Sequence, residues 1–231
     1  MSTNSDSTIL ALDAAGPACS AVLWAGGAVV QRRWEAMERG HAEALMPMAR
    51  DVVADTGFQG LDLVAVSVGP GGYTGLRIAI AAARGLGLAL GIPVIGVGSL
   101  DVHRHIARRD GVAGPMAVLL ETKRADFYLQ LFGADDAPLT DPLVASGTEV
   151  EAQLALHGAA ALVGDAVERF AVQARDPDLP VGRTQAADAA AVAALAFAAH
   201  GVAEGLPPRP MYLRAPDTSP PAADRQRLRG G

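Results

Sequence analysis

The sequence contains a single cysteine, Cys19, among its 231 residues. One cysteine excludes a disulfide within the chain and any metal cluster built on cysteine ligands from one chain. Cys19 lies in the apolar run Ala18 to Trp24. We therefore interpret it as a small strand residue rather than as a nucleophile.

Long apolar runs are also missing. Half of the residues are hydrophobic, yet no stretch reaches the roughly 18 residues that span a membrane without a glycine or a charge. The segment Met1 to Ser7 is polar and has neither the basic start nor the apolar centre of a secretory signal. We expect a soluble, cytoplasmic protein.

Basic residues are fewer than acidic ones, 19 Lys and Arg against 25 Asp and Glu, which gives a formal charge of −6. Binding to a nucleic acid backbone depends chiefly on clustered Lys and Arg. We therefore expect any contact with RNA to be local or to occur through a partner.

No catalytic signature can be recognised. The loop Gly69 to Gly75 precedes an expected helix, but a Walker loop requires Lys and then Ser or Thr after its last glycine, where this chain has Leu76. His103 and His105 are two residues apart, whereas a metal pair on a helix requires a spacing of three or four. We expect no catalytic residue and no metal ion.

Asp13 ends the first expected strand, and Gly16 and Ser20 follow it. Actin-like ATPases place an acidic residue and a phosphate-facing turn at this point, so these three residues are a candidate for a degenerate nucleotide site. No lysine accompanies them. A lone Asp at a strand end also commonly accepts hydrogen bonds from the amides of a turn, and both interpretations remain open.

Short apolar runs separated by turn residues dominate the rest of the chain. In the first half, hydrophobic periodicity and turn chemistry predict strands and helices. The strands are Thr8 to Asp13, Ala18 to Trp24, Ala28 to Trp34, Val64 to Val68 and Ile92 to Val97, and the helices are His41 to Ala54, Thr74 to Leu90 and Ser99 to Arg108. Thr74 is the expected N-cap of its helix, and Pro47 must lie in the first turn of its helix or bend it.

After the linker Gly111 to Pro115 the order partly repeats. The expected elements are strands Met116 to Glu121 and Asp126 to Phe132, a weaker extended region to Ser146, helix Thr148 to His157, strand Ala161 to Gly164 and helix Ala186 to Glu204. Three antiparallel strands followed by α-β-α, occurring twice, predict an α/β protein with two lobes of the ribonuclease H-like, actin-like kind.

The domain boundaries follow from this order. Residues 1–110 are expected to form the first lobe, which binds the partner, and residues 111–214 the second, with its last helix a candidate for packing back on the first lobe. Residues 215–231 are rich in Pro, Arg and Asp and have almost nothing to bury, which predicts a mobile tail.

The helix Thr74 to Leu90 is apolar on two sides. One side carries Leu76, Ile80, Ala83 and Gly87, and the nearly opposite side carries Ile78, Ala82, Gly85 and Ala89. One sheet covers only one of these sides, so either the small residues fill a crowded interior or a second helix covers the other side. We expect a helix of a partner or of a second copy, with the interface formed by Leu45, Met48, Val52, Leu76, Ile80, Ala83 and Gly87.

Several motifs together resemble one family. They are Ile9-Leu10-Ala11-Leu12-Asp13, Ala18-Cys19-Ser20-Ala21-Val22-Leu23-Trp24, His41 with Leu45 to Pro47, Gly69-Pro70-Gly71-Gly72-Tyr73-Thr74-Gly75-Leu76-Arg77, Gly91 to Val97 with Ser99-Leu100, and Pro210-Met211-Tyr212-Leu213-Arg214. The chain is similar to the TsaB (YeaZ) family, which acts in tRNA threonylcarbamoyladenosine biosynthesis. It departs from the pattern at Ala14, where the family usually has Thr, and at Glu121, where the second lobe commonly opens with Asp.

The resemblance implies an actin-like fold and a noncatalytic subunit that assembles with TsaD, the catalytic paralogue that modifies the adenosine beside the tRNA anticodon. It also implies that TsaE, an ATPase, joins the complex and that the chain forms a homodimer when it is alone. The chain would contact tRNA only through the complex. It would need no cofactor unless a nucleotide lies near the lobe junction. TsaD carries a His-x-x-x-His metal motif that would fall on Ser99 and His103, of which only the second is histidine. The alternatives are an ATP-dependent phosphotransferase or a metallopeptidase that uses Asp13 and His103, and a plain RNA-binding module.

Overall fold

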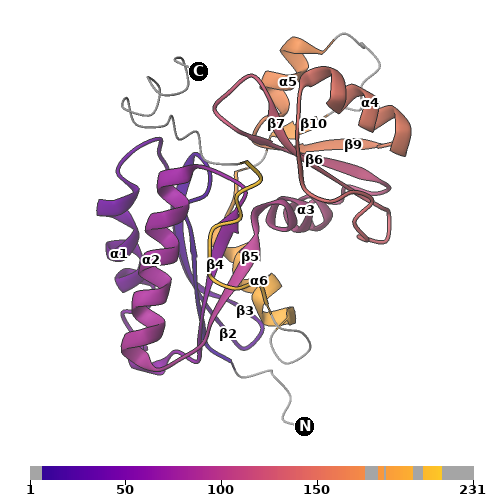
Figure 1. Cartoon of the computed structure of the whole chain (residues 1–231). Coiled ribbons are helices and arrows are strands. Elements are labelled where there is room, and N and C mark those ends of the chain that lie inside the picture. Colours follow the sequence, from indigo (N-terminus) through magenta and orange to yellow (C-terminus); the bar gives the residue numbers. More distant parts are fainter. Residues whose placement is uncertain (1–6, 175–181, 185, 200–204, 215–231) are drawn as a thin grey trace, which may run out of the picture.

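The computed structural model describes residues 7–174, 182–184, 186–199 and 205–214. They form two lobes, each with a five-stranded mixed sheet and helices (Figure 1). None of the helices in these ranges combines the length and the apolarity needed to cross a bilayer. The segment 215–231, expected as a tail, lies outside the described residues.

The first sheet has the strand order β3-β2-β1-β4-β5. Its strands are β1 Ile9–Asp13, β2 Ala18–Ala25, β3 Ala28–Ala36, β4 Leu63–Gly69 and β5 Val94–Gly98. β1 pairs antiparallel with β2 and parallel with β4, and β4 pairs parallel with β5. Every residue of β4 is buried, as expected for an uninterrupted apolar strand between two parallel neighbours.

The second sheet repeats this arrangement in the order β10-β9-β6-β7-β8. Its strands are β6 Met116–Glu121, β7 Phe127–Phe132, β8 Leu143–Ala145, β9 Ala161–Gly164 and β10 Gly182–Thr184. Its first strand, β6, again pairs antiparallel with the next strand and parallel with β9. The predicted two-lobed, ribonuclease H-like organisation is confirmed.

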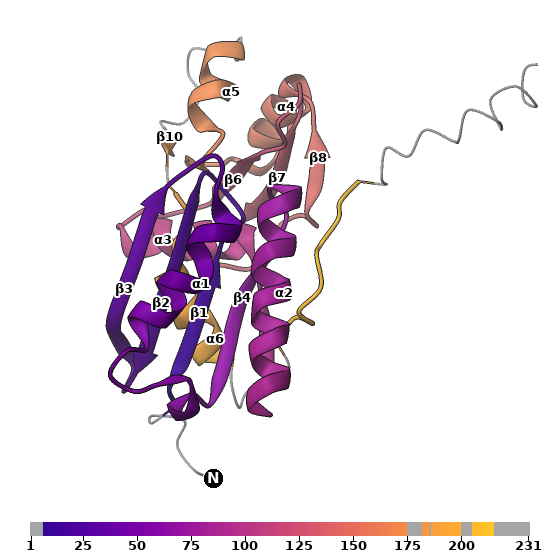
Figure 2. The same ribbon diagram turned by 90° about the vertical axis from the view of Figure 1, so that its left-hand side faces the viewer.

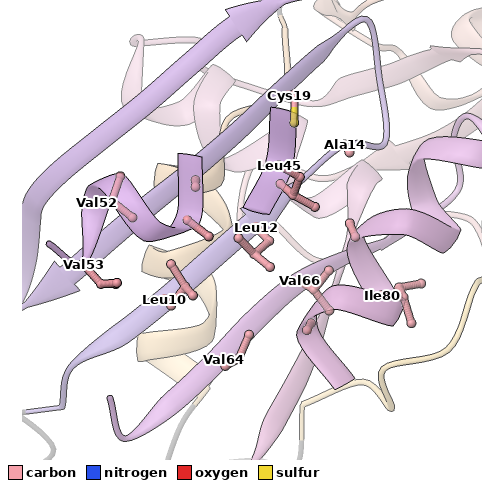
Figure 3. Close-up of a cluster of buried hydrophobic side chains, with 14 of the residues drawn as sticks. Leu10, Leu12, Ala14, Cys19, Leu45, Val52, Val53, Val64, Val66 and Ile80 are labelled. Atoms are coloured by element: carbon pink, nitrogen blue, oxygen red, sulfur yellow. The ribbon is translucent and has the colours of Figure 1, made fainter. Parts of the chain in front are cut away.

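Helices α1 (His41–Val52) and α2 (Tyr73–Leu90) cover one face of the first sheet, and α6 (Ala189–Ala199) covers the other. Figure 2 shows α1 and α2 in front of this sheet and α6 behind it. The core under α1 and α2 joins side chains of β1 and β4 to Leu45 and Ile80 (Figure 3). Each such buried side chain contributes roughly 1.5 to 3 kcal/mol relative to exposure.

Helix α3 (Ser99–Arg109) lies between the lobes. Its Val102 and Ile106 pack in the same cluster as α6, against the first sheet. Its Leu100 and Ala107 pack on the second sheet. Helices α4 (Gly147–His157) and α5 (Val167–Gln173) cover the opposite face of that sheet. Each lobe therefore receives one covering helix from the other half of the chain.

Local details differ from the sequence predictions. Gly72, not Thr74, is the N-cap of α2, and no side chain caps this helix. Pro47 lies inside α1, beyond its first turn. The short elements α5, β10 and the 3-10 helix η2 (Phe58–Gly60) were not predicted. The helix expected to end at Glu204 is described only as far as Ala199.

Cys19 is a buried strand residue, as predicted. It belongs to the core cluster beneath α1 and α2 (Figure 3). Burial raises the pKa of its thiol to about 11, so the thiolate that a nucleophile requires is disfavoured.

Candidate functional site

Asp13 and Ser20 face each other at the ends of β1 and β2. Both are fully buried, and Ser20 Oγ accepts a hydrogen bond of 2.9 Å from the amide of Ala189, the first residue of α6. Neither carboxylate oxygen of Asp13 has a hydrogen-bond partner in the described part of the chain. Asp13 therefore lies in the interior, and its carboxylate is out of reach of a ligand in solution.

The electrostatics of Asp13 agree with this location. Burial raises its pKa from 3.8 to about 6, and the charge of Asp188 adds to the effect. The Ser67 hydroxyl and the Ala15 amide lie near enough to lower the pKa in part, although neither meets hydrogen-bond geometry. The protein thus tolerates a poorly solvated acid at the end of β1.

The turn that follows Asp13 is closed by the glycine-rich loop before α2. The Gly72 amide donates a 2.7 Å hydrogen bond to the Ala15 carbonyl. A Cβ on Gly71 would lie 2.5 Å from the same oxygen, and one on Gly75 would lie 1.9 Å from the carbonyl oxygen of Ala14. Glycine is required here because the two backbones touch, and this contact occupies the loop Gly69 to Gly75.

Gly16 lies at the boundary with the second lobe, where a Cβ would be 3.5 Å from Asp165 Oδ2. Asp165 accepts a 2.8 Å hydrogen bond from the amide of Glu121. Burial, with a smaller contribution from the charge of Glu121, raises the pKa of Asp165 to about 6. Arg169 pairs with Glu121 at 2.7 Å.

The lobe junction therefore brings acidic side chains together. The sequence analysis gave Asp165 no role. Its position directly after the apolar strand Ala161–Gly164, similar to that of Asp13 at the end of β1, is the signal that could have identified it. The structure thus buries Asp13 and Ser20 and places Gly16 beside Asp165.

The donor set on α3 does not fit a metal site. Ser99 and His103 are one turn apart and nearly fully buried, and burial lowers the pKa of His103 to about 4, so its imidazole is neutral at pH 7. Only one of the two side chains is an imidazole. Among the described residues no group of three His, Cys, Asp or Glu side chains could hold a metal ion, and protein zinc sites need at least three ligands.

The predicted interface residues lie in the core, which corrects the sequence-based assignment. Met48 is half-buried against the core cluster, and the others are buried. They pack α1 and α2 onto the sheet, so they are not available to a partner. The buried ones are Leu45, Val52, Leu76, Ile80, Ala83 and Gly87.

The opposite side of α2 is open. Ala81, Gly85 and Ala89 follow one another at intervals of one turn and are exposed. No atom lies within 4 Å of the position that a Cβ would take on Gly85. Leu88 is 87% exposed. Of the second apolar side of the helical wheel, the lobe leaves Gly85 and Ala89 uncovered, whereas Ile78 and Ala82 pack partly against the core. We call the exposed residues Ala81, Gly85, Leu88 and Ala89 the outer flank of α2.

A shallow groove of about 510 Å³ adjoins the outer flank. It is lined by residues of the C-terminal half of α2 and by Ile92 and Val94 near β5. Apolar surface of this kind on a helix at the edge of a lobe is typical of a docking surface. Figure 2 shows that α2 runs along the outside of the first lobe.

Comparisons with known proteins agree with the fold. The family model described as TsaD, tRNA N6-adenosine threonylcarbamoyltransferase, matches residues 34–201. Uncharacterised proteins of Mycobacterium tuberculosis and Mycobacterium bovis are 35% identical over 218 residues, which cover 93% of this chain and 95% of theirs. The tRNA threonylcarbamoyladenosine biosynthesis protein TsaB of Escherichia coli is 33% identical over 130 residues, 55% of this chain and 56% of that protein.

Solved structures give the same relationship. YeaZ from Pseudomonas aeruginosa superposes with a TM-score of 0.73 at 29% identity, covering 90% of this chain and all of that one. A second structure from the same organism, described as similar to the peptidase YEAZ, has a TM-score of 0.77 with the same coverage.

Proposed function

Because the chain belongs to the TsaD family of tRNA N6-adenosine threonylcarbamoyltransferases and is a relative of TsaB (YeaZ) proteins, we propose that it is a noncatalytic subunit that binds a TsaD-type enzyme. It docks through the outer flank of α2 and holds that enzyme in an active arrangement. A TsaE-type ATPase joins the complex, tRNA is bound only through the complex, and two copies pair when the partner is absent. The assembly works in the cytoplasm.

The observation that carries the proposal is the uncovered outer flank. Helix α2 has 18 residues, and its outward positions Ala81, Gly85 and Ala89 are small enough to let another helix approach closely. Leu88, almost fully exposed in the single chain, would gain roughly 1.5 to 3 kcal/mol from burial in an interface. This surface has no role in the packing of the lobe itself.

The state of the lobe junction supports the noncatalytic part of the proposal. Asp13 is buried, the glycine-rich loop packs on the turn beside it, and acids crowd the other side. His103 is a buried neutral imidazole without a second histidine one turn away. Fold alone does not assign chemistry, and the buried Asp13 and His103 lack the accessibility that catalysis requires.

Docking is tested with Gly85→Glu and Ala81→Glu. Both positions are exposed, so the variants should fold, while either carboxylate would become buried and unpaired at a close helix contact and cost several kcal/mol of binding. The measurement is co-elution with the TsaD of the same organism, together with threonylcarbamoylation of tRNA by the reconstituted proteins.

The matched control is Val172→Glu, which places the same charge at an 88% exposed position on α5 of the other lobe. We expect the control to bind and to support modification like the wild type. Full co-elution and full modification by Gly85→Glu would refute docking at this flank.

The alternative function is catalysis by the chain itself. It is suggested by the carboxylate of Asp13, which has no hydrogen-bond partner among the described residues. The purified protein alone is assayed for ATP turnover and for bound metal. We expect neither, and an ATPase activity that disappears in Asp13→Ala would favour the phosphotransferase.

A further inference from the structure

The only charged residues of α2 are two arginines on its exposed surface, Arg77 and Arg84. A spacing of seven residues places them on the same side of the helix, about 10 Å apart along its axis. In the described ranges, no carboxylate forms an ion pair with either of them. The chain as a whole carries a charge of −6, so this helix is a positively charged strip on an acidic protein.

Arg77 is held in a defined position. Its guanidinium lies 3.8 Å from the centroid of the Tyr73 ring, and its Nε donates a 2.8 Å hydrogen bond to the Tyr212 hydroxyl. The two tyrosine rings stack on each other with centroids 5.9 Å apart. Tyr73 is 58% exposed and Tyr212 is 47% exposed, so the arrangement stands at the surface. We call these three residues the arginine clip.

The segment that supplies Tyr212 is itself anchored. The amide of Met211 donates a 2.7 Å hydrogen bond to the carbonyl of Val68, at the end of β4. Arg214 forms an ion pair with Asp126 in the second lobe. A surface arginine normally loses considerable side-chain entropy when it is fixed by a partner. Because the clip has already restricted Arg77, binding at this position costs less.

The position of the clip concentrates positive charge further. Tyr73 is the first residue of α2, and the guanidinium over its ring lies beside the positive end of the helix dipole. A cation there is electrostatically unfavourable in the single chain. A carboxylate of a binding partner would offset the repulsion between the Arg77 guanidinium and the helix dipole, and it would also form an ion pair with Arg77.

From this arrangement we infer the chemistry of the partner surface: it presents two carboxylates about 10 Å apart, one for Arg77 in the arginine clip and one for Arg84. The inference rests on the proposed function, because it describes the TsaD-type surface that docks on the outer flank. The small residues Ala81, Gly85 and Ala89 beside the two arginines let the backbones approach, and the two charges fix the register and orientation of the contact. Tyr and Arg are also the residue types most often found at energetic centres of interfaces.

The test uses the full chain and the TsaD of the same organism. Dissociation constants are measured for the wild type, Arg77→Gln, Arg84→Gln and the double variant at low and at high sodium chloride. Each single substitution should weaken binding at low salt by about three- to tenfold, and the double variant should lose most of the salt dependence of the wild type. Arg109→Gln on α3, whose side chain is 56% exposed, is the control and should change neither quantity.

A further variant isolates the clip. Tyr212→Phe keeps the ring but removes the hydroxyl that accepts from Arg77, so Arg77 becomes less restricted while the total charge is unchanged. Affinity should fall about two- to threefold with the salt dependence preserved, since only preorganisation is lost.

The outcomes separate this inference from the proposed function. If Gly85→Glu abolishes binding while the double arginine variant keeps the affinity and salt dependence of the wild type, the carboxylate partner is refuted and docking at the flank stands. If the wild type binds no TsaD, both are refuted. If the isolated chain binds RNA tightly and the double variant does not, the arginines serve a nucleic acid and the inference is also wrong.

Discussion

Substituting alanine at Gly85 and at Gly87 tests which flank of α2 the lobe covers. The two glycines are two residues apart in the same helix, and the same substitution is made at each. A Cβ on Gly85 meets no atom within 4 Å, whereas a Cβ on Gly87 would lie 2.3 Å from Val94 Cγ2 and 3.1 Å from the carbonyl oxygen of Ile92. The pair therefore differs only in what lies beside the new methyl group.

The expected changes in the free energy of unfolding follow from two effects. Alanine is better than glycine in a helix interior by about 0.8 to 1 kcal/mol, and at Gly85 this is the whole effect. At Gly87 the same gain is opposed by overpacking of about 1 to 3 kcal/mol. Relief is difficult there because the Val94 side chain is β-branched and stiff and the Ile92 oxygen belongs to the backbone. Gly85→Ala should therefore be more stable than Gly87→Ala by about 1 to 3 kcal/mol.

The assay is urea unfolding followed by circular dichroism, with the denaturant slope compared between variants so that a change in midpoint reports stability alone. Gly85→Ala should unfold at a higher urea concentration than the wild type, and Gly87→Ala at the same or a lower one. Equal midpoints for the two variants would refute the assignment of inner and outer flanks, and with it the docking surface.

Two further perturbations probe the lobe junction and the end of α3. Because burial raises the pKa of Asp13 from 3.8 to about 6, the folded state holds an extra proton between these values, and stability falls by up to about 3 kcal/mol as the pH rises from 4 to 6. Asp13→Asn should lose this part of the dependence and exceed the wild type at pH 7 but not at pH 4; parallel stability curves would contradict the buried acid. Arg108 binds Asp136 and the carbonyls of Val112, Gly114 and Gly133, so Arg108→Ala should cost about 2 to 4 kcal/mol in thermal unfolding. Lysine there should restore only part of the loss because it lacks the planar fork, and complete rescue by Arg108→Lys would show that charge alone matters.

Most elements of both sheets could be predicted from the sequence because turn residues bracket them. Met116–Glu121 and Ala161–Gly164 have the expected ends. The strand Gly182–Thr184 and the helix Val167–Gln173 were missed, since three and seven residues are too few to display a period. The expected helix start at Thr74 was one residue late because a glycine, which offers no side chain for capping, holds the N-cap position.

The sequence predicted the candidate site only in part. A helical wheel identifies two apolar sides of α2 but does not state which one the sheet covers. Residue volume does not decide it either, because Ala79, Ala83 and Gly87 are buried while Leu88 is exposed. The burial of Asp13 and His103 and the proximity of Asp165 to Gly16 depend on how the lobes meet, which no local pattern encodes.

Helix α3, from the first half of the chain, covers the second sheet, and α6, from the second half, covers the first, so the two halves depend on each other for stability. Separating the half of the chain before residue 111 from the half after it would remove α6 from Ile9 and Ala11 on one sheet and α3 from Met116 and Val118 on the other, so that two apolar faces would be exposed to water. The molecule should melt in one step, and a chain cleaved at residues 111–115 should yield halves that regain structure only when mixed.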